Sequence, residues 1–272
     1  MRLDLHVHST ASDGTVPPED VVERAIAGGL DVLALADHDT IAGVERARRA
    51  AAGKRIHIIP AVEMSSTFAG TDIHILGYFV DTRSDVFERH TRWNHERRDA
   101  RMLEMVERLA RQGIKISRQQ LDGQRGSADV AYSRPHLARA LVQAGYVSAV
   151  PQAFAELIGN DCPAYVPTRV ATPEEAIRLI LDADGLPVWA HPPAELFQGL
   201  LPRLVRAGLR GLEVYRATRR SVGVAGLEKA ARDNGLVVTG GSDWHGPEGG
   251  TELGDFFVTG DEVAAFLGAG GM

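Results

Sequence analysis

Short apolar runs alternate with amphipathic helical segments along most of the chain. Residues 32–36 are apolar at every position and residues 56–62 at nearly every one, which is typical of strands buried on both faces of a parallel sheet. One helical segment opens with the capping box Thr172-Pro173-Glu174-Glu175. Further strand patterns occur at residues 73–79, 186–190, 211–215, 236–239 and 256–258. The repeated strand–helix units predict an α/β fold whose strands close into a barrel.

Residues 82–161 break this alternation. Their first part is helical and densely charged, with pairs such as Glu104 and Arg108 spaced four residues apart so that they can form ion pairs. The interleaved acids favour a solvated, self-paired helix over a nucleic-acid-binding face. We therefore expect a barrel domain made of residues 1–81 and 162–272, with residues 82–161 as a helical insertion.

Composition narrows the classes of protein and partner. The chain has 272 residues and a net charge of −6, which argues against a broad surface for long nucleic acid but not against a small phosphorylated ligand held through divalent cations. The single cysteine, Cys162, excludes a disulfide framework and a thiolate metal cage. No run is long enough to span a membrane, and the N-terminus lacks the apolar region of a signal peptide, so we expect a cytoplasmic protein.

Side chains that bind metals follow the predicted strands. His6 and His8 are two residues apart on a strand and therefore point to the same face, and Asp13 lies in the turn that follows. The carboxyl ends of parallel strands converge on one face of a barrel, so residues distant in sequence can share one pocket. The residues directly after later strands are Asp37, His38, Asp39, Glu63, His191, Asp243 and His245.

His74 differs because it lies early in its predicted strand. If that strand runs antiparallel to its neighbours, its beginning lies on the same rim. The complete set offers imidazole nitrogens and carboxylate oxygens without sulfur, which suits zinc, manganese or iron and does not separate them. These residues are more than one four-coordinate ion needs, so we expect two or three divalent ions.

Several of these polar residues have a plainer interpretation. Asp37 and Asp39 can equally be turn or cap residues. His57, among isoleucines, is expected to be a packed histidine, and His90 and His95 on the charged helix are expected to be solvated.

Taken in order, the motifs resemble those of the polymerase and histidinol phosphatase (PHP) superfamily. They are His6-x-His8 with Ser12-Asp13-Gly14, Ala36-Asp37-His38-Asp39, Val62-Glu63, His74-Ile75-Leu76-Gly77-Tyr78, Ala190-His191-Pro192 and Gly241-Ser242-Asp243-Trp244-His245-Gly246. With Ser133-Arg134-Pro135-His136 inside the insertion, the resemblance covers nearly the whole chain. It looks most like the short bacterial members that act as nucleoside 3′,5′-bisphosphate phosphatases or 5′-to-3′ oligoribonucleases.

The resemblance implies a distorted (β/α)7 barrel that holds three divalent metals. The implied ligands are His6, His8, Glu63 and Asp243 for the first ion, Glu63, His74 and His191 for the second, and Asp13, His38 and His245 for the third. One departure from the pattern is Arg216-Ala217, where relatives often carry a histidine after the motif Glu213-Val214-Tyr215. That departure affects the expected substrate preference and not the metal ligands.

The expected reaction is hydrolysis of a phosphate ester by a hydroxide held between two metals that share Glu63. Arg134 is the candidate for binding a substrate phosphate, and Arg216 is a second candidate. His136 is either another phosphate contact or the general acid. The expected substrates are a nucleoside 3′,5′-bisphosphate or short 5′-phosphorylated RNA. Two alternatives are a histidinol-phosphate-type phosphatase and a non-catalytic metal-binding module, and the oligomeric state is left open.

Overall fold

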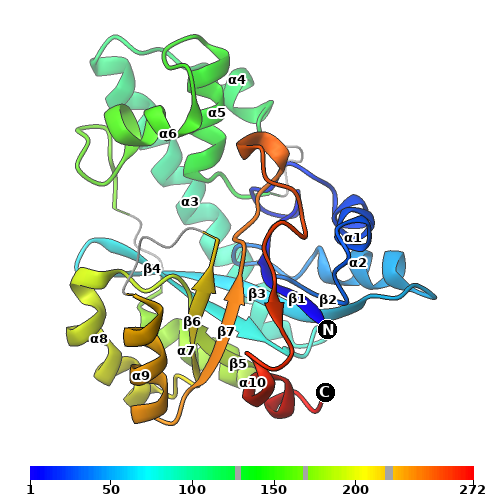
Figure 1. Cartoon of the computed structure of the whole chain (residues 1–272). Helices are drawn as coiled ribbons and strands as arrows, with labels where there is room; N and C mark the ends of the chain where they lie inside the picture. The colour runs from blue at the N-terminus through cyan, green and yellow to red at the C-terminus, as the bar shows by residue number, and fades with distance from the viewer. Residues whose placement is uncertain (126–129, 168–170, 218–222) are drawn as a thin grey trace.

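The apolar runs form one mixed sheet of eight strands that curls into a nearly closed barrel (Figure 1). The computed structural model describes residues 1–125, 130–167, 171–217 and 223–272. The sheet order is β7-β6-β5-β4-β3-β2-β1-β8. The strands are β1 (Arg2–Val7), β2 (Val32–Leu35), β3 (His57–Phe68), β4 (Thr71–Tyr78), β5 (Leu186–Trp189), β6 (Gly211–Arg216), β7 (Val237–Gly241) and β8 (Val258–Thr259). The predicted α/β barrel is confirmed.

Helices cover the outside of the barrel and form the insertion. Those of the barrel are α1 (Pro18–Ala27), α2 (Val44–Ala51), α7 (Pro173–Asp182), α8 (Ala194–Ala207), α9 (Val224–Asp233) and α10 (Ala264–Ala269), with the short 3₁₀ helix η2 (Pro247–Gly249). Those of the insertion are α3 (Asp85–Arg111), α4 (Arg118–Asp122), α5 (Arg134–Gln143), α6 (Val150–Ala153) and the π-helical turn η1 (Phe154–Ile158). Among the described helices, none is both long and apolar enough to cross a bilayer.

Strand β4 runs antiparallel to both of its neighbours, β3 and β5. Its link to β3 is a two-residue turn in which Ala69 and Gly70 have φ values of 50° and 85°, the left-handed pair that a tight hairpin requires. Because β4 is reversed, its early residue His74 lies at the same rim as the ends of the parallel strands. The conditional prediction for His74 is thereby confirmed.

Contacts between β1 and β7 close the barrel at the ends of these two strands. Val7 bridges Trp244 in parallel fashion, the amide of His8 donates to the carbonyl of Trp244 at 2.9 Å, and the amide of Asp243 donates to the carbonyl of His6 at 2.9 Å. These bonds place the polar ends of β1 and β7 side by side.

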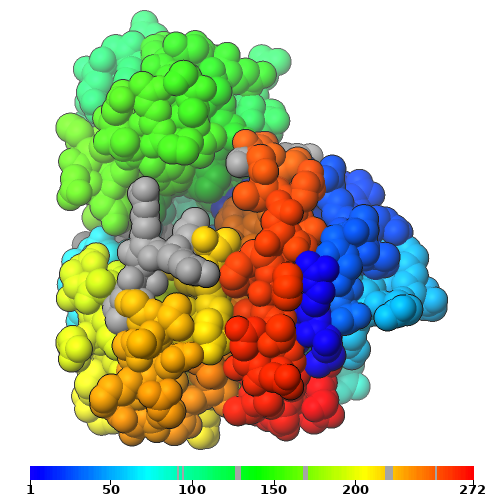
Figure 2. Space-filling model, viewed as in Figure 1, coloured from blue at the N-terminus to red at the C-terminus, as the bar shows by residue number. Residues whose placement is uncertain are grey.

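The insertion stands over the rim and has its own hydrophobic core. Met102, Met105 and Leu109 of α3 pack with Leu137 and Leu141 of α5, and all five are almost fully buried. In the space-filling view the insertion forms a separate lobe above the barrel (Figure 2). The limits of this subdomain at residues 82 and 161 remain a prediction.

Candidate active site

The nine predicted metal ligands converge at the rim beneath the insertion. They come from β1 and the turn after it (His6, His8, Asp13), from the segment after β2 (His38), from β3 and β4 (Glu63, His74), and from the segments after β5 and β7 (His191, Asp243, His245). One detail of the prediction is wrong. β3 does not end at Glu63 but continues to Phe68, because its second half pairs with β4 in the hairpin.

Glu63 lies at the centre of this group, and its two carboxylate oxygens face different imidazoles. Its side chain is 1% exposed. The distances from Oε2 are 3.3 Å to His6 Nε2, 3.3 Å to His8 Nε2 and 3.2 Å to His38 Nδ1. The distances from Oε1 are 3.0 Å to His74 Nδ1 and 3.0 Å to His191 Nε2. One carboxylate therefore joins two separate sets of nitrogen donors.

The other two carboxylates complete two of three overlapping groups. Asp243 Oδ1 lies 3.4 Å from His6 Nε2 and 3.2 Å from His8 Nε2, and Asp13 Oδ1 lies 3.3 Å from His245 Nε2. Within each group the potential ligand atoms are all within 4.8 Å of one another. The groups are His6, His8, Glu63 and Asp243; His38, Glu63 and His74; and His8, Asp13, His38 and His245.

The electrostatics of this cluster suit divalent cations. Burial alone would lower the pKa of His8, but the adjacent carboxylates of Asp243 and Glu63 outweigh burial and raise that pKa to about 10. Burial would raise the pKa of Glu63, yet the surrounding imidazoles, led by His38 and His74, hold it well below its usual value. A proton on the His8 imidazole thus helps to balance the buried carboxylates, and a cation would replace it.

Histidine nitrogens in this cluster that have no hydrogen-bond partner in the described part of the chain also indicate that the cluster binds metal ions. Both ring nitrogens of His8, Nε2 of His6 and Nδ1 of His38 are buried without a hydrogen-bond partner among the described residues. Buried polar atoms are normally paired, so orphaned imidazole nitrogens aimed at carboxylates are characteristic of a ligand set. The residues present therefore fit metal ions bound through nitrogen and oxygen.

Glu213 supports two of the ligands, a role that the sequence did not reveal. It is fully buried on β6, where Oε1 lies 2.8 Å from His6 Nδ1 and Oε2 accepts the backbone N–H of His191 at 2.8 Å. A carboxylate on the outer nitrogen of a metal-binding histidine fixes the orientation of the ring. The clue available in the sequence was a lone acid inside an apolar strand.

Asp37 and Asp39 anchor the backbone around the cluster. Asp37 accepts hydrogen bonds from the amide and hydroxyl of Ser9, both at 2.8 Å, and from the hydroxyl of Ser12 at 2.7 Å. Asp39 accepts the amide of Ser65 at 2.8 Å and pairs with Arg98 of α3 at 2.6 Å. Asp37 therefore holds the loop after β1, in agreement with the plainer interpretation, whereas Asp39 links the segment after β2 to β3 and α3.

A cavity of about 280 Å³ opens above the metal-binding residues. Its upper wall comes from the insertion and contains Arg98, Arg101 and Arg134, while Arg216 of β6 also lines it. Arg134 donates to Asp72 and to Asn160, each at 2.7 Å. The wall is therefore rich in guanidinium groups that acidic or amide partners already hold in place.

Parts of the prediction for α3 are wrong. The ion pair of Glu104 with Arg108 is present at 2.7 Å, but Arg98 and Arg101 have side chains only 12% exposed because the insertion folds onto the barrel. His90, expected to be solvated, is 7% exposed.

The prediction for His57 is also wrong. His57, expected to be packed, lies at an exposed position at the start of β3.

His136 has a structural position. It is 1% exposed, and its Nδ1 accepts the amide of Ser133 at 3.1 Å, which caps the start of α5. Burial lowers its pKa to about 4, so the ring is neutral near pH 7. It does not line the cavity described above. The structure shows His136 in this helix-capping role, and a contact with a phosphate or a leaving group stays a prediction.

Comparison with known proteins extends this description. The PHP domain model matches residues 4–146, just over half of the chain. The chain is 36% identical over 258 residues to the 5′-3′ exoribonuclease of Haemophilus influenzae, with 93% of each protein covered. It is 33% identical over 261 residues to the 3′,5′-nucleoside bisphosphate phosphatase of Chromobacterium violaceum, with 93% of this chain and 90% of that protein covered.

A solved structure agrees in fold over nearly its whole length. A protein of Bifidobacterium adolescentis assigned as a metal-dependent phosphoesterase superposes with a TM-score of 0.89 at 31% identity, covering 97% of this chain and 95% of that one. The rim of histidines and carboxylates, the barrel and these matches agree with one another. The chain belongs to the PHP domain family and is a metal-dependent phosphoesterase.

Proposed function

We propose that this phosphoesterase removes the 3′-phosphate from nucleoside 3′,5′-bisphosphates and releases nucleotides from short 5′-phosphorylated RNA. The observation that carries the proposal is the 280 Å³ cavity, in which buried metal-type ligands line the barrel side and arginines line the insertion side. A substrate with two phosphates matches two anion-binding walls. The activities of the Haemophilus and Chromobacterium relatives support the same substrate class. With a net charge of −6, the chain is not proposed to bind long nucleic acid.

Nine residues are proposed to hold two or three ions of manganese, zinc or iron. They are His6, His8, Asp13, His38, Glu63, His74, His191, Asp243 and His245. When bound, such ions lower the pKa of water and neutralise charge that develops on the phosphoryl oxygens. Glu63 is proposed to bind two of these ions at once, because its two carboxylate oxygens face separate sets of imidazoles.

The chain's other residues are proposed to orient the substrate. Arg134 binds the 5′-phosphate, for which it exchanges its present contact with Asp72, and its planar fork suits a phosphate. Arg216 is proposed as a second phosphate contact, since it lies in the same cavity at 3.5 Å from Glu213. In the reaction an oxygen of water adds to the 3′-phosphorus, the P–O3′ bond breaks, and the 3′-oxygen gains a proton.

The proposal is tested by phosphate release from a nucleoside 3′,5′-bisphosphate, with and without added Mn²⁺. Histidinol phosphate and a 5′-phosphorylated RNA of a few nucleotides are compared under the same conditions, with RNA cleavage followed by chromatography. We expect metal-dependent turnover of the bisphosphate and the RNA, with much slower turnover of histidinol phosphate. A preference for histidinol phosphate would identify the alternative phosphatase. No turnover of any of the three compounds by metal-loaded protein would favour the non-catalytic alternative.

A further inference from the structure

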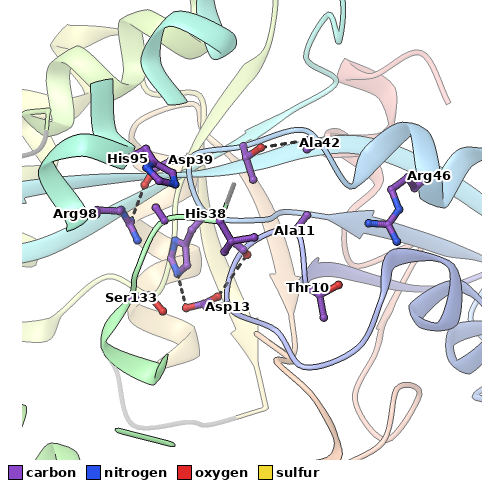
Figure 3. Close-up of a pocket in the computed structure, with 14 residues that line it drawn as sticks. Thr10, Ala11, Asp13, His38, Asp39, Ala42, Arg46, His95, Arg98 and Ser133 are labelled. Atoms are coloured by element: carbon purple, nitrogen blue, oxygen red, sulfur yellow. Dashed lines mark hydrogen bonds and ion pairs between the residues drawn. The ribbon is translucent and has the colours of Figure 1, made fainter. Parts of the chain in front are cut away.

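A second cavity, of about 220 Å³, lies beside the first and opens from the same metal-binding rim (Figure 3). The two cavities share Asp13, His38, Arg98 and Ser133 as lining residues. Arg134 and Arg216 line only the first. The proposed 5′-phosphate site at Arg134 and the second cavity therefore lie on different sides of the four residues that both cavities share.

The walls of this second cavity combine small side chains with planar polar groups. Thr10, Ala11 and Ala42 leave space on the barrel side. His95 and Arg98 are three residues apart on α3 and therefore neighbours on one face of that helix. Imidazole rings and guanidinium planes are surfaces on which nucleobases stack. In Figure 3 these two side chains lie on one side of the cavity and Arg46 lies on the other.

Arg46 presents a guanidinium, paired with Glu19, to the far side of this cavity. Its Nε and Nη2 donate to Glu19 at 2.8 and 2.7 Å, which fixes the guanidinium, while Nη1 has no hydrogen-bond partner among the described residues. A guanidinium held in place that still has a free N–H donor can bind an anion. At about 220 Å³, the cavity has room for a further part of a substrate that extends beyond the first cavity.

We propose that the second cavity binds the nucleoside on the 3′ side of the scissile phosphate when the substrate is an oligonucleotide. This inference rests on the proposed function. A nucleoside bisphosphate ends at its 3′-phosphate and uses only the first cavity. In RNA a second nucleoside is attached to that phosphate, and the second cavity begins beside His38 and Asp13, where the phosphate would lie.

The chemistry of chain shortening is consistent with this arrangement. An oxygen of water adds to phosphorus, the P–O3′ bond of the first nucleoside breaks, and a proton passes to its 3′-oxygen. The phosphate stays on the second nucleoside as a new 5′-phosphate. The remaining RNA then has the same end group as the original substrate, so it can be shortened again.

The test fills the second cavity without changing a metal ligand. Ala42 lines it and is exposed, so Ala42→Trp should be tolerated by the fold. With metal-loaded protein, we expect kcat/KM to fall at least 20-fold for a 5′-phosphorylated dinucleotide and to stay within threefold for a nucleoside 3′,5′-bisphosphate. The matched control is Ala265→Trp, at an exposed position of α10 on the opposite end of the barrel (Figure 1). It should change neither value by more than threefold.

A binding measurement separates stacking from catalysis. The probe is a 5′-phosphorylated dinucleotide with a CH₂ group in place of the scissile 3′-oxygen and fluorescent 2-aminopurine as its second base. Fluorescence should be quenched on binding to the metal-loaded protein, and His95→Ala should weaken binding roughly tenfold, the size of one stacking contact.

The outcomes distinguish the two proposals. Equal losses on both substrates in Ala42→Trp, no loss on either, or an unquenched probe would overturn the role of the second cavity. Hydrolysis of the bisphosphate without any cleavage of the dinucleotide by the unaltered protein would also overturn it and leave bisphosphate hydrolysis standing. Failure of the unaltered protein to hydrolyse the bisphosphate would instead count against the proposed function.

Discussion

The barrel rim and the insertion wall face the same cavity but are built differently. The rim consists of histidines and acids that lie on strands or in the segments that follow them, and His6 and His8 are fully buried. The wall consists of long arginine side chains from helices, such as Arg98 and Arg134, which are 12% and 18% exposed and already paired with acids. Buried donors on or next to strands have little freedom to move, whereas an arginine can exchange one anion for another. The contrast indicates that the rim determines the chemistry and the wall determines the substrate.

The strongest test of the rim is Glu63→Gln. An amide offers one oxygen in place of two, so one of the two sets of imidazoles loses its acceptor. We expect at least one bound metal ion per chain to be lost and kcat/KM to fall by at least 1,000-fold, about 4 kcal/mol. Metal content is measured on the purified protein, and circular dichroism checks the fold. Wild-type turnover by a folded Glu63→Gln protein would refute the bridging role.

The strongest test of the wall is Arg134→Ala. A charge-assisted, bidentate contact contributes about 2–3 kcal/mol, so kcat/KM for a nucleoside 3′,5′-bisphosphate should fall on the order of 30- to 150-fold. Metal content should not change. Loss of activity on a substrate with one phosphate should be much smaller. Arg118→Ala, an exposed arginine of α4 that pairs with Asp122, is the control. Equal losses on both substrates would move Arg134 to the scissile phosphate or to a structural role.

Glu213→Gln tests the support behind the rim. The amide keeps the size of the side chain but weakens the contact with His6 Nδ1, so metal affinity should fall about 10- to 100-fold. Competition with a chelator measures that affinity. Glu228→Gln is the matched control, because Glu228 accepts a hydrogen bond from Tyr215 of β6, away from the ligands. If both variants bind metal equally well, Glu213 does not position the metal-binding histidine.

The smallest expected effect separates two adjacent arginines of α3. Arg98 lines both cavities, whereas Arg97 packs over Trp93 at 4.3 Å. We expect Arg98→Ala to lower kcat/KM for the bisphosphate about tenfold, or about 1.4 kcal/mol, and Arg97→Ala to lower it less than twofold. Similar values for the two variants would show that Arg98 does not contact the substrate.

The sequence was most informative where the barrel imposes a simple rule. Polar residues at the ends of apolar runs must meet at one rim, so the grouping of His6, Glu63, His191 and Asp243 follows from the order of strands and helices alone. The continuation of β3 past Glu63 does not follow from that order, because it depends on pairing with β4.

The insertion was less predictable for a related reason. Helical periodicity shows that a face exists but not what it packs against, so the burial of Arg98 and His90 had no clear sign in the sequence. His136 stands in a recognisable motif, yet a side chain that caps its own helix and one that binds a phosphate look alike there. The position of Glu213 behind His6 depends on the pairing of distant strands.

The backbone at the rim affects how mutagenesis there will be interpreted. Asp39, His191 and Asp243 have φ values of 55°, 31° and 58°, a left-handed conformation that costs a non-glycine residue on the order of 1–3 kcal/mol. Alanine at these positions would keep that cost while removing the side chain, so an alanine scan would mix a loss of folding with a loss of function. Asparagine tolerates this conformation, and glycine relieves it. A mutant library selected only for folding should therefore accumulate glycine and asparagine at these three positions.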